Sequence, residues 1–285
     1  MTISKVGLLV TSNQLREKLS HILWHKRLDT KIRVLDASYD FDKQDDGYKE
    51  FYLNGHIPSS VYFNHRQCTE STPFIPFNLP DTNCFTDYVQ SLGVSSDTHI
   101  ITYDRMDMRA ALRAWWMFRL HGHNNISVLD GGLKKWVRDG HPVTTEEPTV
   151  ERGNFKARVD QSLMRDFNSM RENVKSKKEQ VIDARGSGSF NDVVKTDSGD
   201  QKANLPGAIN IPYATVFNED GTFKSVENLQ NVFKAASVDF RKPLVAMCQR
   251  GITACALAAA AEILGKPNTP IYYGSWYEYS RKIAQ

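Results

Sequence analysis

Short apolar runs in the first half of the chain recur in the second half, in the same order. Residues 34–38 (Val-Leu-Asp-Ala-Ser) resemble residues 181–185 (Val-Ile-Asp-Ala-Arg), and each is a β-branched run containing an acid, as is typical of a buried strand. Residues 55–62 resemble residues 203–210, and the spacing from the acid to the proline differs by one residue between the copies.

The match continues through a further strand, a helix and a last strand. The matching segments are residues 100–104 with 244–248, 108–120 with 252–264, and 127–133 with 270–276. The long segments have helical periodicity and the short ones have the pattern of buried strands. Strand–helix alternation at these lengths indicates parallel βαβ units.

The repeat predicts two tandem copies of one α/β fold, each a mainly parallel central sheet flanked by helices. Between the copies, residues 142–156 are rich in Pro, Thr and Glu, which is typical of a linker. We expect a first domain at residues 1–142, a linker at 143–158 and a second domain at 159–285. The alternative is one large α/β domain in which the similarity is coincidental.

Composition narrows the class of protein. The chain has 285 residues, enough for one or two domains. Hydrophobic residues make up 40% and charged residues 24%, a composition that excludes a collagen-like or wholly disordered chain. The net charge of +3 is spread along the sequence, unlike the basic stripe of a nucleic-acid binder. No apolar run is long enough to span a membrane, and the first residues lack the pattern of a secretory signal.

Four cysteines are too few for a disulfide scaffold, and they show no metal-ligand spacing. We therefore expect a reducing compartment, with the cytoplasm as the default location, and no metal. Cys68 and Cys84 are interpreted as ordinary thiols. Cys255 is expected to pack against the sheet from an Ala-rich helix.

The copies differ at the end of the central strand, where the first has Asp104 and the second has Cys248. Ligands of open α/β sheets bind at the carboxyl ends of strands, so Cys248 occupies the position of a catalytic group. In residues 248–254, Gly251 permits a tight loop whose N–H groups can point at the sulfur, and the following helix adds its dipole. With Arg250, these features favour thiolate over thiol. The alternative is a small buried hydrophobic residue.

The loop Cys-Gln-Arg-Gly-Ile-Thr-Ala resembles the catalytic loop of the rhodanese family of sulfurtransferases, and the resemblance extends over almost the whole chain. Four more motifs are similar to that family: His56-Ile57-Pro58, Trp115-Trp116-Met117-Phe118, Leu129-Asp130-Gly131-Gly132 and Tyr272-Tyr273-Gly274-Ser275-Trp276. Tandem members of the family have an inactive first domain and a catalytic second domain. The resemblance therefore implies that the copy with Asp104 is non-catalytic.

The resemblance also implies a ping-pong reaction. The Cys248 thiolate takes the outer sulfur of a donor and becomes a persulfide, from which a nucleophile then removes the sulfur. No metal or organic cofactor is needed, because sulfur itself carries the electrons. The loop N–H groups would stabilise the anionic persulfide, which assigns a persulfide-stabilising role to Gln249, Gly251, Ile252 and Thr253.

Two arginines are candidates for binding the anionic part of the donor. Arg250 lies in the loop, and Arg185 stands where the first copy has Ser38; in the family, an arginine at that position contacts substrate. The alternative for Arg185 is a surface salt bridge. Asp183 is interpreted as structural, because Asp36 repeats it in the copy without the cysteine.

The identity of the donor stays open between two subfamilies. Thiosulfate-preferring members resemble Cys-Arg-Lys-Gly and mercaptopyruvate-preferring members resemble Cys-Gly-Ser-Gly or Cys-Gly-Thr-Gly, so Gln249-Arg250 matches neither. A cation suits the thiosulfate dianion and cannot replace the hydroxyl of a Ser-His-Asp relay, whose other members are not recognisable in residues 62–66 and 75–79. Thiosulfate is expected, with 3-mercaptopyruvate as the alternative. Ser189, where some relatives carry another arginine, weakens either assignment.

The expected partners are a small anionic sulfur donor and an acceptor that is cyanide, a small thiol or a thioredoxin-like dithiol, with no nucleic acid and no membrane. Tandem relatives also occur in mitochondria, which is the alternative location. A non-catalytic or redox-regulatory rhodanese module is the alternative of another class. A phosphatase is disfavoured, because the related Cys-x5-Arg loop would need arginine where Ala254 stands.

Overall fold

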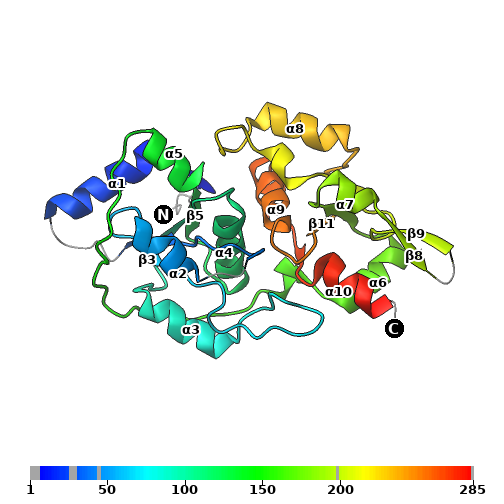
Figure 1. Cartoon of the computed structure of the whole chain (residues 1–285), viewed down its shortest axis with the longest axis horizontal. Helices are drawn as coiled ribbons and strands as arrows, with labels where there is room; N and C mark the ends of the chain where they lie inside the picture. The colour runs from blue at the N-terminus through cyan, green and yellow to red at the C-terminus, as the bar shows by residue number, and fades with distance from the viewer. Residues whose placement is uncertain (1–6, 26–30, 44–45, 197–198, 284–285) are drawn as a thin grey trace. The chain divides into compact units, whose positions relative to one another are not determined.

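The computed structural model describes residues 7–25, 31–43, 46–196 and 199–283 (Figure 1). Its contacts divide the chain into two units. The first consists of Met1–Thr69, Pro80–Asp160 and Glu219–Thr222, and the second of Glu70–Leu79, Gln161–Asn218 and Phe223–Gln285. Each unit contains one copy of the sequence repeat.

The first unit is built on a five-stranded parallel sheet in the order β1-β5-β4-β2-β3. The strands are β1 (Leu9–Val10), β2 (Ile32–Asp36), β3 (Val61–Tyr62), β4 (His99–Tyr103) and β5 (Ile126–Leu129). The helices are α1 (Ser12–His25), α2 (Gly47–Glu50), α3 (Thr82–Ser91), α4 (Arg109–Leu120) and α5 (Gly132–Arg138), with a 3-10 turn at Tyr52–Asn54. The β-branched runs form the central strands because both faces of a parallel sheet are buried.

The second unit repeats this topology, with a parallel sheet in the order β10-β7-β11-β12-β6. Its strands are β6 (Met164–Arg165), β7 (Gln180–Asp183), β10 (Ile209–Asn210), β11 (Leu244–Met247) and β12 (Ile271–Tyr272), and β8 (Val193–Thr196) with β9 (Gly199–Lys202) forms a separate hairpin. The helices are α6 (Phe167–Ser176), α7 (Ser187–Asn191), α8 (Val226–Ala235), α9 (Ala254–Ile263) and α10 (Ser275–Ile283), with 3-10 turns at Gln161–Leu163 and Tyr213–Val216.

The equivalence of the two sheets confirms the predicted fold class. β2, β4 and β5 correspond to β7, β11 and β12, and in both copies the central strand leads into a buried helix, α4 or α9. The alternative of one large α/β domain is wrong, because the contacts divide the chain into two units and no strand pairing joins the two parallel sheets among the described residues. The predicted bounds, 1–142, 143–158 and 159–285, stay a prediction; residues 145–160 have neither helix nor strand.

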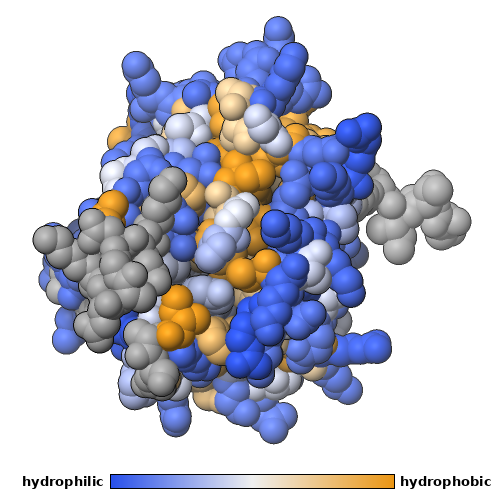
Figure 2. Space-filling model, turned by 90° about the vertical axis from the view of Figure 1, so that its right-hand side faces the viewer, coloured by the Kyte–Doolittle hydropathy of each residue, from blue (hydrophilic) through white to orange (hydrophobic). Residues whose placement is uncertain are grey.

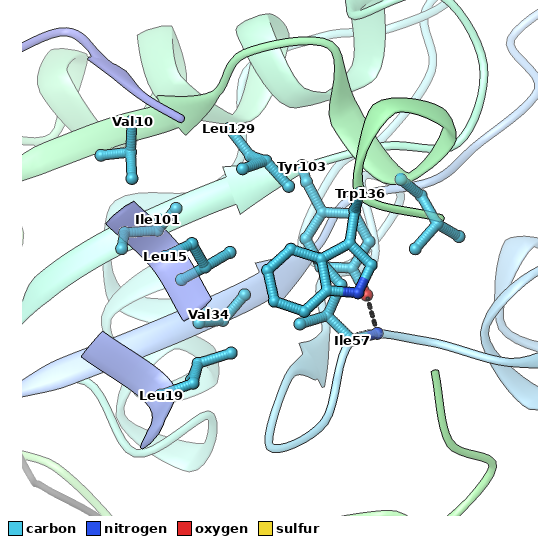
Figure 3. Close-up of a cluster of buried hydrophobic side chains, with 10 residues drawn as sticks. Val10, Leu15, Leu19, Val34, Ile57, Ile101, Tyr103, Leu129 and Trp136 are labelled. Carbon is cyan, nitrogen blue, oxygen red and sulfur yellow. Dashed lines mark hydrogen bonds between the residues drawn. The ribbon is translucent and has the colours of Figure 1, made fainter. Parts of the chain in front are cut away.

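A buried apolar cluster lies against the sheet of the first unit (Figure 3). Trp136 of α5 packs there with residues from α1 and the central strands, and its indole N–H donates to the Pro142 carbonyl at 2.8 Å. Tyr103 of β4 is fully buried, and its hydroxyl accepts the Ile57 N–H at 3.1 Å and bonds the Ser60 hydroxyl at 2.9 Å. This hydrogen bond fixes the His-Ile-Pro segment to the central strand.

The surface carries few large apolar side chains. On the face drawn in Figure 2, apolar residues form a band between hydrophilic ones. Those that are clearly exposed in the described ranges come from both units: Leu53, Val137, Val143, Val193, Val226 and Ile283. Single exposed residues of this kind are normal on a protein surface. No helix in the described ranges is long and apolar enough to cross a membrane.

The interpretation of Cys68 and Cys84 as ordinary thiols is wrong. They form a disulfide with a Cα–Cα distance of 5.6 Å, and the Asp81 N–H donates to the Cys68 carbonyl at 3.1 Å beside it. Cys84 lies in the first turn of α3, and the N-cap residue Asp81 accepts the Cys84 N–H. The start of α3 thus places Cys84 next to Cys68. Sequence spacing does not reveal such a return. The expectation of a reducing compartment loses the support of cysteine usage.

We predict that Tyr103→Phe destabilises the chain by about 1–3 kcal/mol, because the buried Ile57 N–H loses its acceptor. Urea titration followed by tryptophan fluorescence measures the change. Tyr48→Phe is the matched control, since its hydroxyl bonds Glu147 at the surface and its loss should cost far less. Equal free energies of unfolding for the two variants would contradict the assigned role of the Tyr103 hydroxyl.

Candidate functional site

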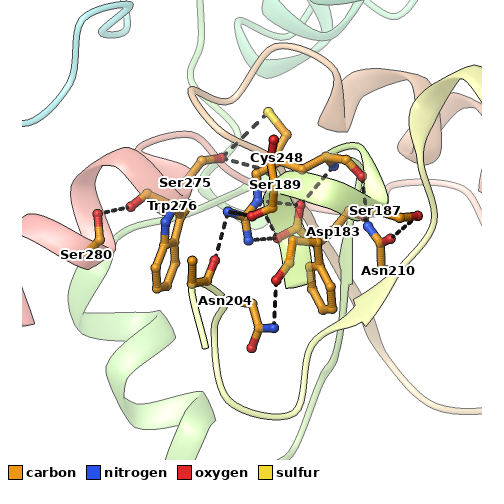
Figure 4. Close-up of polar contacts among 12 residues, drawn as sticks. Asp183, Ser187, Ser189, Asn204, Asn210, Cys248, Ser275, Trp276 and Ser280 are labelled. Atoms are coloured by element: carbon orange, nitrogen blue, oxygen red, sulfur yellow. Dashed lines mark hydrogen bonds and ion pairs between the residues drawn. The ribbon is translucent and has the colours of Figure 1, made fainter. Parts of the chain in front are cut away.

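Cys248 follows β11 directly and begins the loop before α9, at the carboxyl end of the central strand (Figure 4). Its side chain is buried, at 1% exposure. The Ile252 N–H donates to its Sγ at 3.1 Å. Burial fits the alternative of a small buried hydrophobic residue, but a backbone donor aimed at the sulfur does not follow from that alternative. The arrangement is suited to a sulfur anion.

The shape of the loop depends on Gly251. Its φ is +76°, and a Cβ there would lie 2.2 Å from the Tyr273 carbonyl oxygen, so both conformation and space require glycine. This close approach turns the chain so that the next N–H, that of Ile252, points back at the sulfur. Of the residues predicted to stabilise a persulfide, Ile252 therefore contacts the Cys248 sulfur directly. The roles of Gln249, Gly251 and Thr253 in binding a persulfide stay predictions.

The start of α10 fixes the loop from the other side. The N–H groups of Trp276 and Tyr277 donate to the carbonyls of Cys248 and Gln249 at 3.0 and 2.9 Å. These donors are free for that purpose because the first N–H groups of a helix have no partner within it. The carbonyls of Cys248 and Gln249 are thus bound by the first N–H groups of α10.

Ser275 belongs to the site, and the sequence reasoning missed it. Its hydroxyl accepts the Cys248 N–H at 3.1 Å, donates to the Tyr272 carbonyl at 2.7 Å and lies 3.9 Å from the Cys248 Sγ (Figure 4). Its φ of +55° is unusual for a residue with a side chain. The signal available was its position just after β12, the strand beside β11, where side chains at carboxyl ends converge.

Arg185 is buried rather than at the surface, with 5% exposure. Its guanidinium pairs with Asp183 through Nε and Nη2, with contacts of 2.7 to 3.1 Å, and Nη1 donates to the Ala203 carbonyl at 2.9 Å. Arg185 does form a salt bridge, but the alternative of a surface salt bridge is wrong because both partners are buried. Asp183 also accepts the backbone N–H of Arg185, which is consistent with a structural role. Donor binding by Arg185 stays a prediction.

Two aromatic rings cover the guanidinium of Arg185. Its Cζ lies 5.1 Å from the Trp276 ring and 5.7 Å from the Phe190 ring, within range of a cation–π interaction. Trp276 therefore contacts both parts of the site, since its backbone N–H binds the Cys248 carbonyl. Ser189, noted at the sequence level, accepts a long bond of 3.4 Å from Arg185 through its carbonyl.

Arg250, the other predicted donor-binding residue, is half-buried and contacts an aromatic ring. Its Cζ lies 5.4 Å from the ring of Phe77, which is 4% exposed. Phe77 belongs to residues 70–79, the segment that the contacts assign to the second unit. The role of Arg250 toward a donor stays a prediction.

Asp104 shows what the same loop does in the first copy. Its carboxylate accepts four backbone N–H groups: those of Met106, Met108, Ala110 and Ala111, at 2.9 to 3.1 Å. Met108 stands four residues after Asp104, as Ile252 stands four after Cys248. Burial raises the pKa of Asp104 to about 6, and the N–H groups oppose that shift. The loop after the central strand therefore binds an anion in this copy.

In the residues that the structure describes, no group of three or more His, Cys, Asp or Glu side chains is placed to hold a metal ion. That a metal or organic cofactor is unnecessary stays a prediction.

The fold and the site together define a class: a tandem α/β protein whose second copy carries a cysteine in a loop that directs a backbone N–H at the sulfur. The family model of the rhodanese-like domain matches residues 18–139 and 166–282. The chain belongs to the rhodanese-like family, as the motifs predicted.

Curated relatives and a solved structure resemble nearly the whole chain. It is 43% identical to a thiosulfate sulfurtransferase of Gallus gallus over 92% of this chain and 90% of the relative. It is 35% identical to a 3-mercaptopyruvate sulfurtransferase of Homo sapiens over 89% and 86%. The fold is also similar to the crystal structure of SseA from Escherichia coli, described as a 3-mercaptopyruvate sulfotransferase with the rhodanese fold. The match has a TM-score of 0.83 and 30% identity, and it covers 95% of this chain and 99% of the SseA chain.

We predict that Asp104→Asn lowers the free energy of unfolding by about 1–3 kcal/mol at pH 8, where the carboxyl is ionised. The new amide brings N–H groups to face backbone N–H groups, so part of the loop loses its acceptor. Asp107→Asn is the control in the same loop: its half-buried carboxylate pairs with Arg109, and such pairs contribute about 0–1 kcal/mol. Urea titration at pH 8 measures both. A smaller loss for Asp104→Asn than for Asp107→Asn would contradict the anion-loop interpretation.

Proposed function

We propose that the chain is a sulfurtransferase that moves sulfane sulfur from a small anionic donor to a thiol or cyanide acceptor through a persulfide on Cys248. The observation that carries the proposal is the Ile252 N–H aimed at the Cys248 Sγ at 3.1 Å, in a loop whose counterpart binds a carboxylate. The activities named for the curated relatives support it.

The chemistry balances without a cofactor. The Cys248 thiolate attacks the outer sulfur of thiosulfate, the sulfur–sulfur bond of the donor breaks, and sulfite leaves with the electron pair. Cyanide then attacks the terminal sulfur of the persulfide, that bond breaks, and thiocyanate leaves as the Cys248 thiolate is restored. A thiol acceptor would replace cyanide in the second step.

The loop supplies fixed donors for the charge that both steps place on sulfur. The Ile252 N–H is already directed at Sγ, and the Ser275 hydroxyl lies 3.9 Å from it. Donors held in place by the backbone need no reorganisation when charge develops, which is the basis of oxyanion-hole catalysis. In this proposal Gln249, Gly251 and Thr253 shape the loop around the terminal sulfur.

Thiosulfate is the proposed donor, and 3-mercaptopyruvate is the alternative. Arg250 places a permanent positive charge two residues after Cys248, which favours a dianion. Arg185 is committed to Asp183, so in this proposal it contributes through the remaining N–H capacity of its guanidinium. The relative at 43% identity carries the thiosulfate name and the one at 35% the mercaptopyruvate name, which supports the same order.

The proposed location is the cytoplasm, with the mitochondrion as the alternative, and the acceptor stays open among cyanide, small thiols and thioredoxin-like dithiols.

A second candidate is a non-catalytic or redox-regulatory module. The observation that favours it is the 1% exposure of Cys248, because a catalytic sulfur must meet both donor and acceptor. Direct detection of sulfur on this residue separates the two candidates.

We predict that incubation with thiosulfate adds one sulfur atom to Cys248, measured by mass spectrometry of the cyanide-free protein after alkylation. Trypsin cleaves after Arg250 and so separates the peptide of Cys248 from that of Cys255. Cys248→Ser should gain no sulfur, whereas Cys255→Ala, which changes a buried thiol in α9, should load like the wild type. Absence of sulfur on Cys248 after exposure to either donor would favour the regulatory module.

We predict that Arg250→Ser lowers kcat/KM about ten- to a hundredfold for thiosulfate and less for 3-mercaptopyruvate, since a lost charge-assisted bond costs about 1.5–3 kcal/mol. Steady-state assays with each donor and cyanide measure the change. Arg241→Ser is the control, because Arg241 is a highly exposed arginine paired with Asp239. Equal losses for the two donors in Arg250→Ser would count against thiosulfate as the preferred donor.

A further inference from the structure

Trp276, the second residue of α10, contacts two groups of the site through two different parts of itself (Figure 4). Its backbone N–H donates to the Cys248 carbonyl at 3.0 Å, and its ring lies 5.1 Å from the Cζ of Arg185. All three residues belong to the second unit. One residue therefore connects the loop of the sulfur with the guanidinium.

The first copy of the repeat has the backbone contact without the ring. Residues 127–133 match residues 270–276, so Leu133 stands where the second copy has Trp276. The Leu133 N–H donates to the Asp104 carbonyl at 2.8 Å, as the Trp276 N–H does to the Cys248 carbonyl. The backbone bond thus belongs to the shared fold, and the fold does not require an aromatic side chain to make it.

The ring and the arginine are present in the same copy and absent from the other. Where the second copy has Arg185, the first has Ser38, whose hydroxyl accepts the Arg105 N–H at 3.1 Å. Leu133 packs into the apolar cluster of its own unit. The tryptophan therefore occurs in the copy that has a guanidinium at this position for its ring to cover.

The guanidinium of Arg185 is held at its edges by hydrogen bonds and on its faces by rings. Asp183 and the Ala203 carbonyl accept its N–H groups at 2.7 to 3.1 Å, and these bonds lie along the edges. The rings of Trp276 and Phe190 lie 5.1 and 5.7 Å from its Cζ. Bonds along an edge allow the plane to tilt, whereas a ring against a face opposes the tilt.

Trp276 is itself fixed within α10. Its carbonyl accepts the Ser280 hydroxyl at 2.8 Å, and its ring stacks with Tyr279, one helical turn further on, at a centroid distance of 6.2 Å. The ring therefore has a defined position before any donor binds.

We propose that Trp276 is a positioning residue that sets where the guanidinium of Arg185 lies relative to the Cys248 sulfur. The inference rests on the proposed function, because it takes Arg185 as a group that binds the anionic part of the donor. In thiosulfate that part is bonded directly to the sulfur that Cys248 attacks, so the guanidinium must lie at a fixed place for the outer sulfur to reach Sγ. Cyanide has no such part, and its attack on the persulfide does not depend on Arg185.

The two steps of a ping-pong reaction are measured separately, since kcat/KM for thiosulfate reports the donor step and kcat/KM for cyanide the acceptor step. In Trp276→Leu we expect the thiosulfate value to fall about five- to thirtyfold, because the lost cation–π contact is desolvated, and the cyanide value to stay within about twofold. Leucine is the residue of the first copy, which makes the same backbone bond. Trp276→Phe keeps a ring and should lie closer to the wild type for thiosulfate.

Phe167→Leu is the matched control. It removes another partly buried ring, which lies 5.7 Å from the Cζ of Arg171 and packs on the same apolar cluster as Trp276. Because Phe167 covers a different arginine, both kcat/KM values should stay within about twofold. Thermal unfolding verifies that each variant folds.

Two kinetic outcomes would overturn the proposal and leave the proposed function standing. An unchanged thiosulfate value in Trp276→Leu would show that the ring does not act on the donor. Equal losses for thiosulfate and cyanide would show that the ring supports the sulfur loop as a whole rather than Arg185.

A further readout is independent of activity. Phenylglyoxal modifies accessible guanidinium groups, and its rate at Arg185, followed by peptide mass spectrometry, should rise in Trp276→Leu but not in Phe167→Leu. An unchanged rate at Arg185 in Trp276→Leu would overturn the proposal whether or not the protein transfers sulfur. Absence of sulfur on Cys248 of the wild type would instead refute the proposed function.

Discussion

The site depends on one constraint: after the central strand of each sheet, the chain must turn so that backbone N–H groups face the first side chain of the loop. In the second unit the close approach of Gly251 to the Tyr273 carbonyl produces this turn, and the Ile252 N–H meets the Cys248 sulfur. In the first unit four N–H groups surround the Asp104 carboxylate. Both copies place a backbone N–H four residues on against the group at the strand end, so the difference between them is one of side chain more than of fold.

The sequence predicted the parts of the structure that local patterns encode. Buried strands have β-branched runs, and the repeat of those runs at constant spacing was enough to predict two parallel sheets of equal topology. The position of Cys248 followed from the rule that ligands bind at carboxyl ends of strands. The pattern of apolar runs does not reveal that residues 70–79 group with the second unit, so this assignment was not predicted.

Contacts between distant residues were the other limit of the sequence. Cys68 and Cys84 looked unremarkable because a disulfide depends on where the start of α3 returns the chain, not on composition. Ser275 appeared only as part of a motif, since its hydroxyl reaches Cys248 across neighbouring strands. Arg185 was expected to face solvent or donor, whereas Asp183, two residues before it, draws the guanidinium inward, and Trp276 and Phe190 cover it. Desolvating an arginine is tolerated only with such a partner.

The Asp104 carboxylate affects what else the loop of the first unit can bind. The carboxylate that fills its loop is attached to the same chain, so its effective concentration at the N–H groups is far above that of any solute. Free anions therefore compete poorly for that receptor, whatever their intrinsic affinity. The loop of the first unit therefore behaves as a receptor whose ligand is a carboxylate of the same chain.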